Sequence, residues 1–405
     1  MNNSRINIIS KKIIISSLIL SLLFVFSNTS HSYKKKSLKD VYKDDFLIGV
    51  SVGSQDIFHY YKYPMRKDKS EMKIINREFN CITAENLMKP QYICPHPGVY
   101  YFDAVDELMD FAEKNNHVVV GHVLVWHAMT ANSFFEDEKG NLLDREKMIS
   151  RMREYIHKVV SRYKGRIKYW DVVNEAVDLR TVVDHDGNRI QEAFLRKSKW
   201  TEIIGDDFIE LAFKFAHEAD PNAELIYNDF TMNNKIKAKF VSNMCQKIRE
   251  KGIRVDGIGM QAHWHINYPS KEELKEVMKI FRDADLKVHL TELDIGILER
   301  PNVQQDADIS RRSKLNSALN PYTNNVPSRI LLQHAEKYTD IFDILLENRD
   351  IVDRVTFWGV SDGISWLNDW PIEGRTAHPL LFDRFNKPKP AYDFLIDLGI
   401  KYQRN

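Results

Sequence analysis

The 405-residue sequence is poor in cysteine and almost free of net charge. Its three cysteines include no C-x-x-C pair, so we expect neither a disulfide framework nor a zinc ribbon, and a bridge between Cys81 and Cys94 stays an open question. The 58 Lys and Arg against 57 Asp and Glu leave a net charge of +1, which gives no basis for a nucleic-acid partner. With 43% apolar and 28% charged residues, the composition excludes disordered, collagen-like and multi-span membrane proteins.

The N-terminus is basic and then apolar, which predicts a secretory signal peptide over residues 1–32. Basic residues precede an apolar run from Ile13 to Phe26, and small polar residues follow it. This run of 14 residues is short for a membrane span, which needs about 20, although an uncleaved anchor is the alternative. We therefore expect a secreted or periplasmic protein without a stable membrane span after cleavage, with residues 33–405 as the folded domain.

Strand-length apolar runs alternate with amphipathic helical stretches along the rest of the chain. The eight runs are Phe46–Val52, Phe79–Glu85, Val118–Trp126, Ile167–Glu175, Glu224–Asp229, Gly257–Trp264, Lys287–Leu293 and Arg354–Val360. The alternation predicts an α/β fold of parallel strands, and the number eight favours a single (β/α)8 TIM barrel over an open sheet. No G-x-G-x-x-G motif follows the first run and no short internal repeat is present. The polar segment Arg300–Pro327 predicts a long loop after the seventh strand.

Polar and aromatic residues gather where these strands end. They are Glu85 and Asn86, His122 and Trp126, Asn174 and Glu175, Gln261 and His263, Glu292 and Asp294, and Trp358. Active sites of TIM barrels lie at the carboxyl ends of the strands. The sequence therefore predicts a polar cleft with aromatic walls at this rim.

Glu175 and Glu292 end the fourth and seventh strands, which lie on opposing sides of the predicted barrel. Glycoside hydrolysis needs two carboxyl groups, one to protonate the departing oxygen and one to attack or stabilise the positively charged sugar carbon. Either glutamate alone reads equally well as a surface ion-pair partner. Two of them on one rim favour a glycosidase.

Nine segments resemble, in chain order, the signatures of glycoside hydrolase family 10. They are Ile82–Lys89, Gly121–His127, Trp170–Ala176, Tyr227–Asp229, Gly259–His263, Thr291–Asp294, Phe357–Trp366, Pro379–Asp383 and Lys387–Tyr392. The similarity extends from about Asp45 to Leu398. It implies a retaining endo-β-1,4-xylanase on a (β/α)8 barrel.

The resemblance assigns Glu175 as the acid/base and Glu292 as the nucleophile, with carboxyl groups about 5–5.5 Å apart as retention requires. It implies that His263 and Asp294 support Glu292 in its ionised form. Asn174 matches the residue that binds the sugar 2-hydroxyl at subsite −1.

The resemblance also implies a set of substrate-binding residues: Glu85, Asn86, Lys89, His122, Trp126, Gln261, Trp358 and Trp366. Among these, Trp358 and Trp366 match a pair that crowds the C5 substituent and so favours xylose over glucose. We expect the other tryptophans Trp170 and Trp200 to pack in the core. Met129, Phe230 and Thr231 depart from the residues frequent in the family, which leaves the subsite preferences open.

Three other functions compete with this hypothesis. The His263-Trp264-His265 spacing suits two metal ligands on one strand, so a metal-dependent hydrolase is one alternative. A non-catalytic xylan-binding protein and a β-glucanase or mixed-specificity enzyme are the others. The favoured function predicts no cofactor and no metal, xylan or xylo-oligosaccharide as substrate, and a monomer.

Overall fold

The computed structural model describes residues 36–53, 68–299 and 313–404. The predicted signal peptide, residues 1–32, and the first part of the predicted loop, residues 300–312, lie outside the described residues. Ser37–Asn405 form one structural unit. Within the described ranges, no helix combines the length and the apolar character that a membrane crossing requires.

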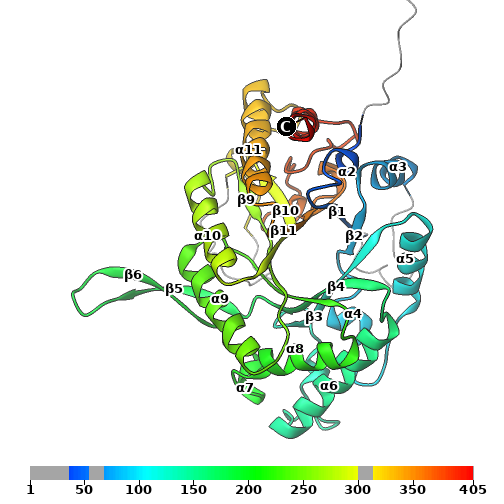
Figure 1. Ribbon diagram of the computed structural model, residues 1–405, viewed down its shortest axis with the longest axis vertical. Coiled ribbons are helices and arrows are strands. Elements are labelled where there is room, and N and C mark those ends of the chain that lie inside the picture. Colours follow the sequence, from blue (N-terminus) through cyan, green and yellow to red (C-terminus); the bar gives the residue numbers. More distant parts are fainter. Residues whose placement is uncertain (1–35, 54–67, 300–312, 405) are drawn as a thin grey trace, which may run out of the picture. The chain divides into compact units, whose positions relative to one another are not determined.

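A nine-stranded sheet forms the centre of this unit (Figure 1). The short strand β9 (His263–His265) is added at the end of β10, and the remaining eight strands close on themselves because β11 pairs with both β1 and β10. These eight are β1 (Leu47–Val52), β2 (Cys81–Ala84), β3 (Val118–Trp126), β4 (Ile167–Asn174), β7 (Glu224–Asp229), β8 (Gly257–Met260), β10 (Lys287–Gly296) and β11 (Val352–Phe357). All their pairings are parallel, which confirms the predicted TIM barrel.

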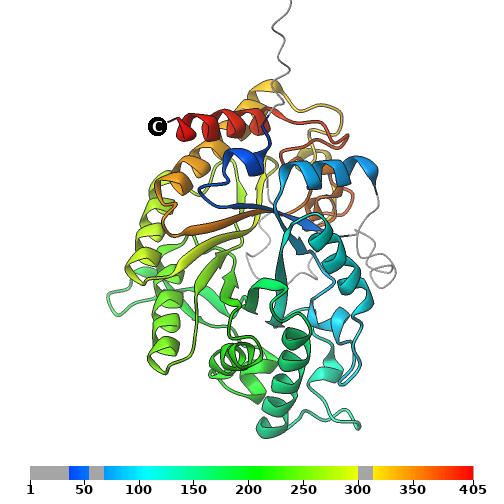
Figure 2. The same cartoon turned by 45° about the vertical axis from the view of Figure 1, so that its right-hand side comes forward.

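Helices lie between the strands along the chain and surround the barrel (Figures 1 and 2). They are α2 (Leu38–Val41), α3 (Lys69–Glu78), α4 (Pro90–Ile93), α5 (Asp103–Lys114), α6 (Arg145–Arg162), α7 (Lys199–Ile203), α8 (Phe208–Ala219), α9 (Lys235–Glu250), α10 (Lys271–Asp283), α11 (Ser328–Glu347) and α12 (Pro390–Gln403). Helix α9 is capped by Asn234, whose side chain accepts from the first-turn amides of Ile236 and Lys237. The C-terminal helix packs on α2, where Tyr42 Oη donates to the Leu395 carbonyl at 2.7 Å.

The core fills the barrel and the space between strands and helices. Trp170 and Trp200 are buried in it, as expected. A Cβ on Gly121 would lie 2.2 Å from Trp170, so the indole packs directly against the backbone of β3. All three cysteines are free and buried, so no Cys81–Cys94 bridge is formed.

Two elements differ from the sequence-based expectation. The sixth predicted strand, Gly257–Trp264, is interrupted between β8 and β9, where Ala262 adopts a φ of +61° that no strand allows. An antiparallel hairpin of β5 (Val177–Val183) and β6 (Arg189–Leu195) follows β4 and was not predicted. Its mixed and partly exposed side chains carry no clear apolar alternation, and it projects away from the barrel (Figure 1).

Candidate active site

The structure brings the sequence-predicted site residues together at the carboxyl ends of the barrel strands. Most are buried: Asn86, Lys89, His122, Trp126, Asn174, Glu175, Gln261, Glu292, Asp294 and Trp358. Glu85, His263 and Trp366 are partly exposed. Buried polar groups need partners, and the hydrogen bonds between these side chains define the site.

A chain of amide groups links the two glutamates. Gln261 Nε2 donates to Glu175 Oε1 at 2.8 Å and to Asn174 Oδ1 at 3.2 Å. Asn228 Nδ2 donates to the same Asn174 oxygen at 2.9 Å and to Glu292 Oε1 at 2.8 Å. Three side chains therefore connect Glu175 to Glu292 and orient both carboxyl groups over one region of the rim.

Both the side chain and the backbone carbonyl of Glu175 accept hydrogen bonds. Its second oxygen, Oε2, accepts from Trp126 Nε1 at 2.8 Å, and its carbonyl accepts from Arg196 Nε at 2.9 Å. Its φ of +58° lies in the left-handed region, which costs a residue with a Cβ about 1–2 kcal/mol. Strained backbone of this kind persists where surrounding contacts over-determine it, as they do here.

His263 lies between two carboxylates. Its Nε2 lies 3.1 Å from Glu292 Oε2, and its Nδ1 lies 2.9 Å from Asp294 Oδ2. Burial alone would lower the pKa of His263, but Asp294 and Glu292 raise it to about 9, so the ring carries a proton on both nitrogens at neutral pH. Burial alone would likewise raise the pKa of Glu292, and the hydrogen bond from His263 with nearby positive charge lowers it to about 2. Glu292 is thus a carboxylate at neutral pH.

Glu85, Asn86 and Lys89 form a polar group beside this pair. Lys89 Nζ donates to Asn86 Oδ1 at 2.8 Å and lies 5.1 Å from the ring centroid of Trp126. Burial raises the pKa of Glu85, and Lys89 opposes that shift. The group offers hydrogen-bond donors and acceptors beside the carboxyl end of β2.

Two tryptophan rings of the site lie beside His122 and His263. Trp358 meets His122 and His263 edge to face, with ring centroids 5.4 and 6.3 Å apart. Trp366 stacks on Trp370 at 4.9 Å and donates through Nε1 to Asp294 Oδ2 at 2.8 Å. Because the N–H of Trp366 is engaged, its ring orientation is tied to that of His263 through Asp294.

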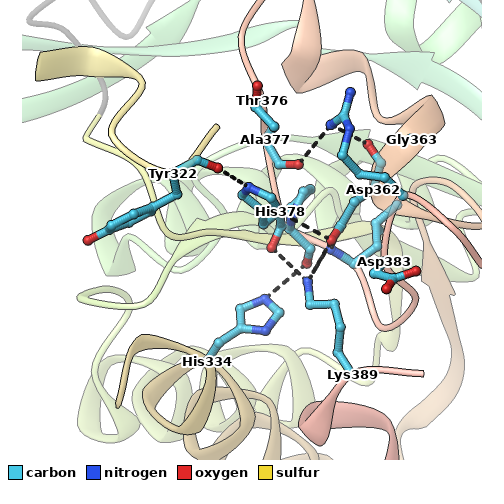
Figure 3. A network of polar contacts seen from close by, with 12 residues as sticks. Tyr322, His334, Asp362, Gly363, Thr376, Ala377, His378, Asp383 and Lys389 are labelled. Atoms are coloured by element: carbon cyan, nitrogen blue, oxygen red, sulfur yellow. Dashed lines mark hydrogen bonds and ion pairs between the residues drawn. The ribbon is translucent and has the colours of Figure 1, made fainter. Parts of the chain in front are cut away.

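A buried polar network supports the loop that carries Trp366 (Figure 3). Lys389 Nζ lies 3.0 Å from Asp362 Oδ2 and donates to the His378 carbonyl at 2.9 Å. His378 Nε2 lies 2.9 Å from the Tyr322 carbonyl, and His334 Nε2 lies 3.2 Å from that of Pro379. The network ties the segments that follow β10 and β11 to each other, which limits the movement of the aromatic wall.

Three further residues of the site, Asn228, Arg196 and Asp171, are not among those predicted from the sequence. Asn228 directly precedes Asp229 at the end of β7, the signal that could have identified it. Asp171 Oδ2 lies 2.9 Å from His122 Nδ1, below the rim. Arg196 follows the hairpin, whose position only the folded chain reveals.

The residues that depart from the family pattern follow the carboxyl ends of β3 and β7. Lys237 Nζ lies 4.1 Å from the ring centroid of Phe230 and 2.7 Å from Oδ1 of buried Asp229. Thr231 and Met129 have φ values of +56° and +47°. These segments are turns directly after β7 and β3, where side chains reach a substrate.

The metal-dependent alternative finds no support at His263. Both of its ring nitrogens face carboxylates at hydrogen-bond distance, so neither is free to coordinate an ion. Over the described ranges, the side chains arranged to ligate a metal are Glu224, His289 and Asp353, and none of them belongs to this site.

Known proteins resemble this chain over most of its length. Residues 37–398 match the family described as "Glycosyl hydrolase family 10". An endo-1,4-beta-xylanase A of Xylanibacter ruminicola is 40% identical over 89% of this chain and 93% of its own length. A beta-1,4-xylanase of Dictyoglomus thermophilum is 36% identical over 92% and 96% of the two chains.

Solved structures agree with these relatives. A GH10 endoxylanase retrieved from a sugarcane soil metagenome superposes with a TM-score of 0.80 at 41% identity, covering 89% of this chain and all of the other. A xylanase from Paenibacillus barcinonensis, complexed with a conduramine derivative, gives 0.74 at 34% identity over 89% and 98%. Since the family match covers residues 37–398, which include every strand of the barrel, the chain belongs to glycosyl hydrolase family 10.

Proposed function

We propose that this protein is a secreted endo-1,4-β-xylanase that cleaves internal bonds of xylan with retention of configuration. Glu292 acts as the nucleophile and Glu175 as the acid/base. The observation that carries the assignment is the asymmetric setting of the two carboxyl groups. Glu292 accepts a hydrogen bond from the cationic ring of His263, which favours its ionised form, whereas the donors to Glu175 are the neutral N–H groups of Trp126 and Gln261.

In the first step, a Glu292 oxygen attacks the anomeric carbon while Glu175 gives its proton to the glycosidic oxygen, and the bond to the departing sugar breaks. The product is a glycosyl ester on Glu292. In the second step, Glu175 removes a proton from water, and the resulting oxygen attacks the same carbon and releases Glu292. The two inversions together retain the configuration.

Two neighbouring residues assist the reaction without forming or breaking covalent bonds. Asn174, fixed by its contacts with Gln261 and Asn228, is placed to bind the sugar 2-hydroxyl, a contact that strengthens in the transition state. His263 stabilises the carboxylate of Glu292 before attack and after release.

The substrate is assigned from the relatives and from the aromatic wall. The relatives carry the names endo-1,4-beta-xylanase A and beta-1,4-xylanase, and the ring centroids of Trp358 and Trp366 lie 6.3 and 4.8 Å from that of His263. Bulky rings at this position leave little room for the hydroxymethyl group that glucose has and xylose lacks. Asn86 and Lys89 supply hydrogen bonds to the next sugar.

Two substitutions separate the roles of the glutamates. Glu175→Ala should lose cleavage of xylan but still release dinitrophenol from an aryl β-xylobioside, because that leaving group needs no proton. Glu292→Ala should lose both reactions. Proton NMR of the initial product should show the β-anomer from the wild-type enzyme.

Glu210→Gln serves as the control, since Glu210 pairs with Lys251 outside the site. Full xylan cleavage by Glu292→Ala would overturn the mechanism. Hydrolysis of cellulose or mixed-linkage glucan in preference to xylan would assign a β-glucanase instead. Binding of xylan without any product would assign the non-catalytic function. Detection of the protein in the culture medium, beginning near residue 33, tests the proposed secretion.

A further inference from the structure

His289 lies on β10, at the opposite end of the barrel from the catalytic rim. Its side chain has no exposed surface, and neither of its ring nitrogens has a hydrogen-bond partner among the described residues. Burial and the nearby charges of Arg354, Lys168 and Lys287 hold the pKa of His289 well below its ordinary value, so the ring is neutral. A buried imidazole with two unused nitrogens costs free energy unless something binds it.

Two carboxylates face this ring. One oxygen of Glu224 on β7, one of Asp353 on β11 and one nitrogen of His289 all lie within 4.8 Å of one another. The three residues come from three strands at the amino ends of the barrel. The carboxylate side chains are 26% and 25% exposed, so an ion has access to the site from solvent.

We propose that Glu224, His289 and Asp353 bind a divalent transition-metal ion, with Zn²⁺ as the best match. A neutral imidazole with two carboxylates is a ligand set that zinc uses, and water completes the fourth position. This departs from the sequence-based expectation of no metal. The ion stabilises the barrel, since the amino-terminal face of a TIM barrel serves stability and not catalysis.

The geometry requires only small movements. Zinc ligand atoms lie about 2.0–2.2 Å from the ion and so roughly 3–3.5 Å from one another. Rotation of the partly exposed carboxylates brings their oxygens toward the ring nitrogen. A Cβ on Gly257 would lie 3.0 Å from His289 Nε2, so glycine at that position lets the ring pack close to the backbone of β8.

Nearby lysines pair with the two carboxylates and compete with a metal ion for them. Lys168 lies 3.7 Å from Glu224, and Lys287 lies 3.2 Å from Asp353. Both lysines are about half exposed and can turn into solvent when an ion replaces them. Arg354 is fully buried. Its Nη1 donates a hydrogen bond to Thr356 Oγ1 and its guanidinium lies over the ring of Tyr169, so this side chain stays in place.

The test uses the untagged full chain, freed of metal with a chelator and dialysed against Zn²⁺ or Co²⁺. We expect one ion per chain, a higher melting temperature in Zn²⁺, and visible absorption from bound Co²⁺. The double variant Glu224→Gln/Asp353→Asn should lose at least about tenfold in affinity and the Zn²⁺-induced shift in melting temperature. Its rate on xylan should equal that of the wild type, which separates this proposal from the proposed function.

Glu210→Gln is the matched control, because Glu210 is also 25% exposed and paired with a lysine. It should bind metal as the wild type does. The variant His289→Gln should also lose metal binding. If His289→Gln does not fold, the double variant Glu224→Gln/Asp353→Asn is the decisive test. Unchanged binding in the double variant, or no ion bound by the wild type in excess Zn²⁺, would overturn the proposal.

Discussion

Nε2 of His263 lies 3.1 Å from Oε2 of Glu292, while the same ring reaches Asp294 through Nδ1 at 2.9 Å. The histidine is thus a cation between two anions, and its proton is part of the folded state. This coupling makes both stability and activity depend on pH through one residue.

We predict that His263→Gln flattens the dependence of stability on pH. The pKa of His263 is about 9 in the folded protein and near 6.5 in the unfolded chain. Its stabilising contribution is therefore complete below 6.5 and is lost as the pH rises through 9. Urea unfolding at several pH values checks this, with the exposed His185→Gln as control. An unchanged slope between pH 6.5 and 9 in His263→Gln would contradict it.

The same variant should also change the acid limb of activity. Against the effect of burial, the hydrogen bond and charge of His263, with His122 and Lys89, lower the pKa of Glu292 to about 2 from its usual value of 4.5. Without the cation, Glu292 takes up its proton at higher pH, and the acid limb of kcat/KM for the free enzyme moves upward. An acid limb that stays in place would show that His263 does not control Glu292.

Trp366→Phe keeps the aromatic ring but removes the N–H that Asp294 accepts. Hydrogen bonds to charged groups contribute about 1.5–3 kcal/mol, so we expect a loss of that size in the free energy of unfolding. Trp370→Phe is the control, because Trp370 Nε1 is buried and finds no hydrogen-bond partner in the described part of the chain. Equal losses in the two variants would mean that ring packing, and not the bond to Asp294, is what Trp366 contributes.

Lys389→Met should destabilise the protein strongly. Lys389 and Asp362 are both buried, and removal of one partner from a buried ion pair costs about 3–5 kcal/mol because the other charge is left uncompensated. Lys275→Met breaks an exposed pair with Glu347 and should cost less than about 1 kcal/mol. Chemical denaturation of both variants measures the difference, and similar values would refute the role of the network in Figure 3.

Thr231→Asn should raise stability by about 1 kcal/mol. Thr231 has a φ of +56°, and a β-branched residue tolerates this region poorly whereas asparagine adopts it readily. The reverse change, Asn116→Thr, alters a turn with the same φ of 56° and should destabilise by a similar amount. Opposite shifts in melting temperature are expected, and shifts of the same sign would contradict the strain argument.

The fold was largely predictable because its signals are local. Apolar runs of strand length recur eight times with helical patterns between them, and the runs at Val118–Trp126 and Glu224–Asp229 match β3 and β7 residue for residue. The prediction was wrong where a local signal was missing. Ala262 interrupts the sixth strand through its backbone conformation, and the hairpin after Glu175 lacks an apolar face.

The sequence by itself determined which chemistry the rim offers, since strand ends place Glu175, Glu292 and their polar neighbours at one end of a barrel. Only the tertiary structure decided which atoms meet. Trp126, expected as a wall against sugar, also donates to Glu175, and Asn228 joins Asn174 to Glu292, residues 54 and 64 positions away along the chain. Hydrogen bonds depend on distances of a few tenths of an ångström, and such distances follow from how the whole barrel closes.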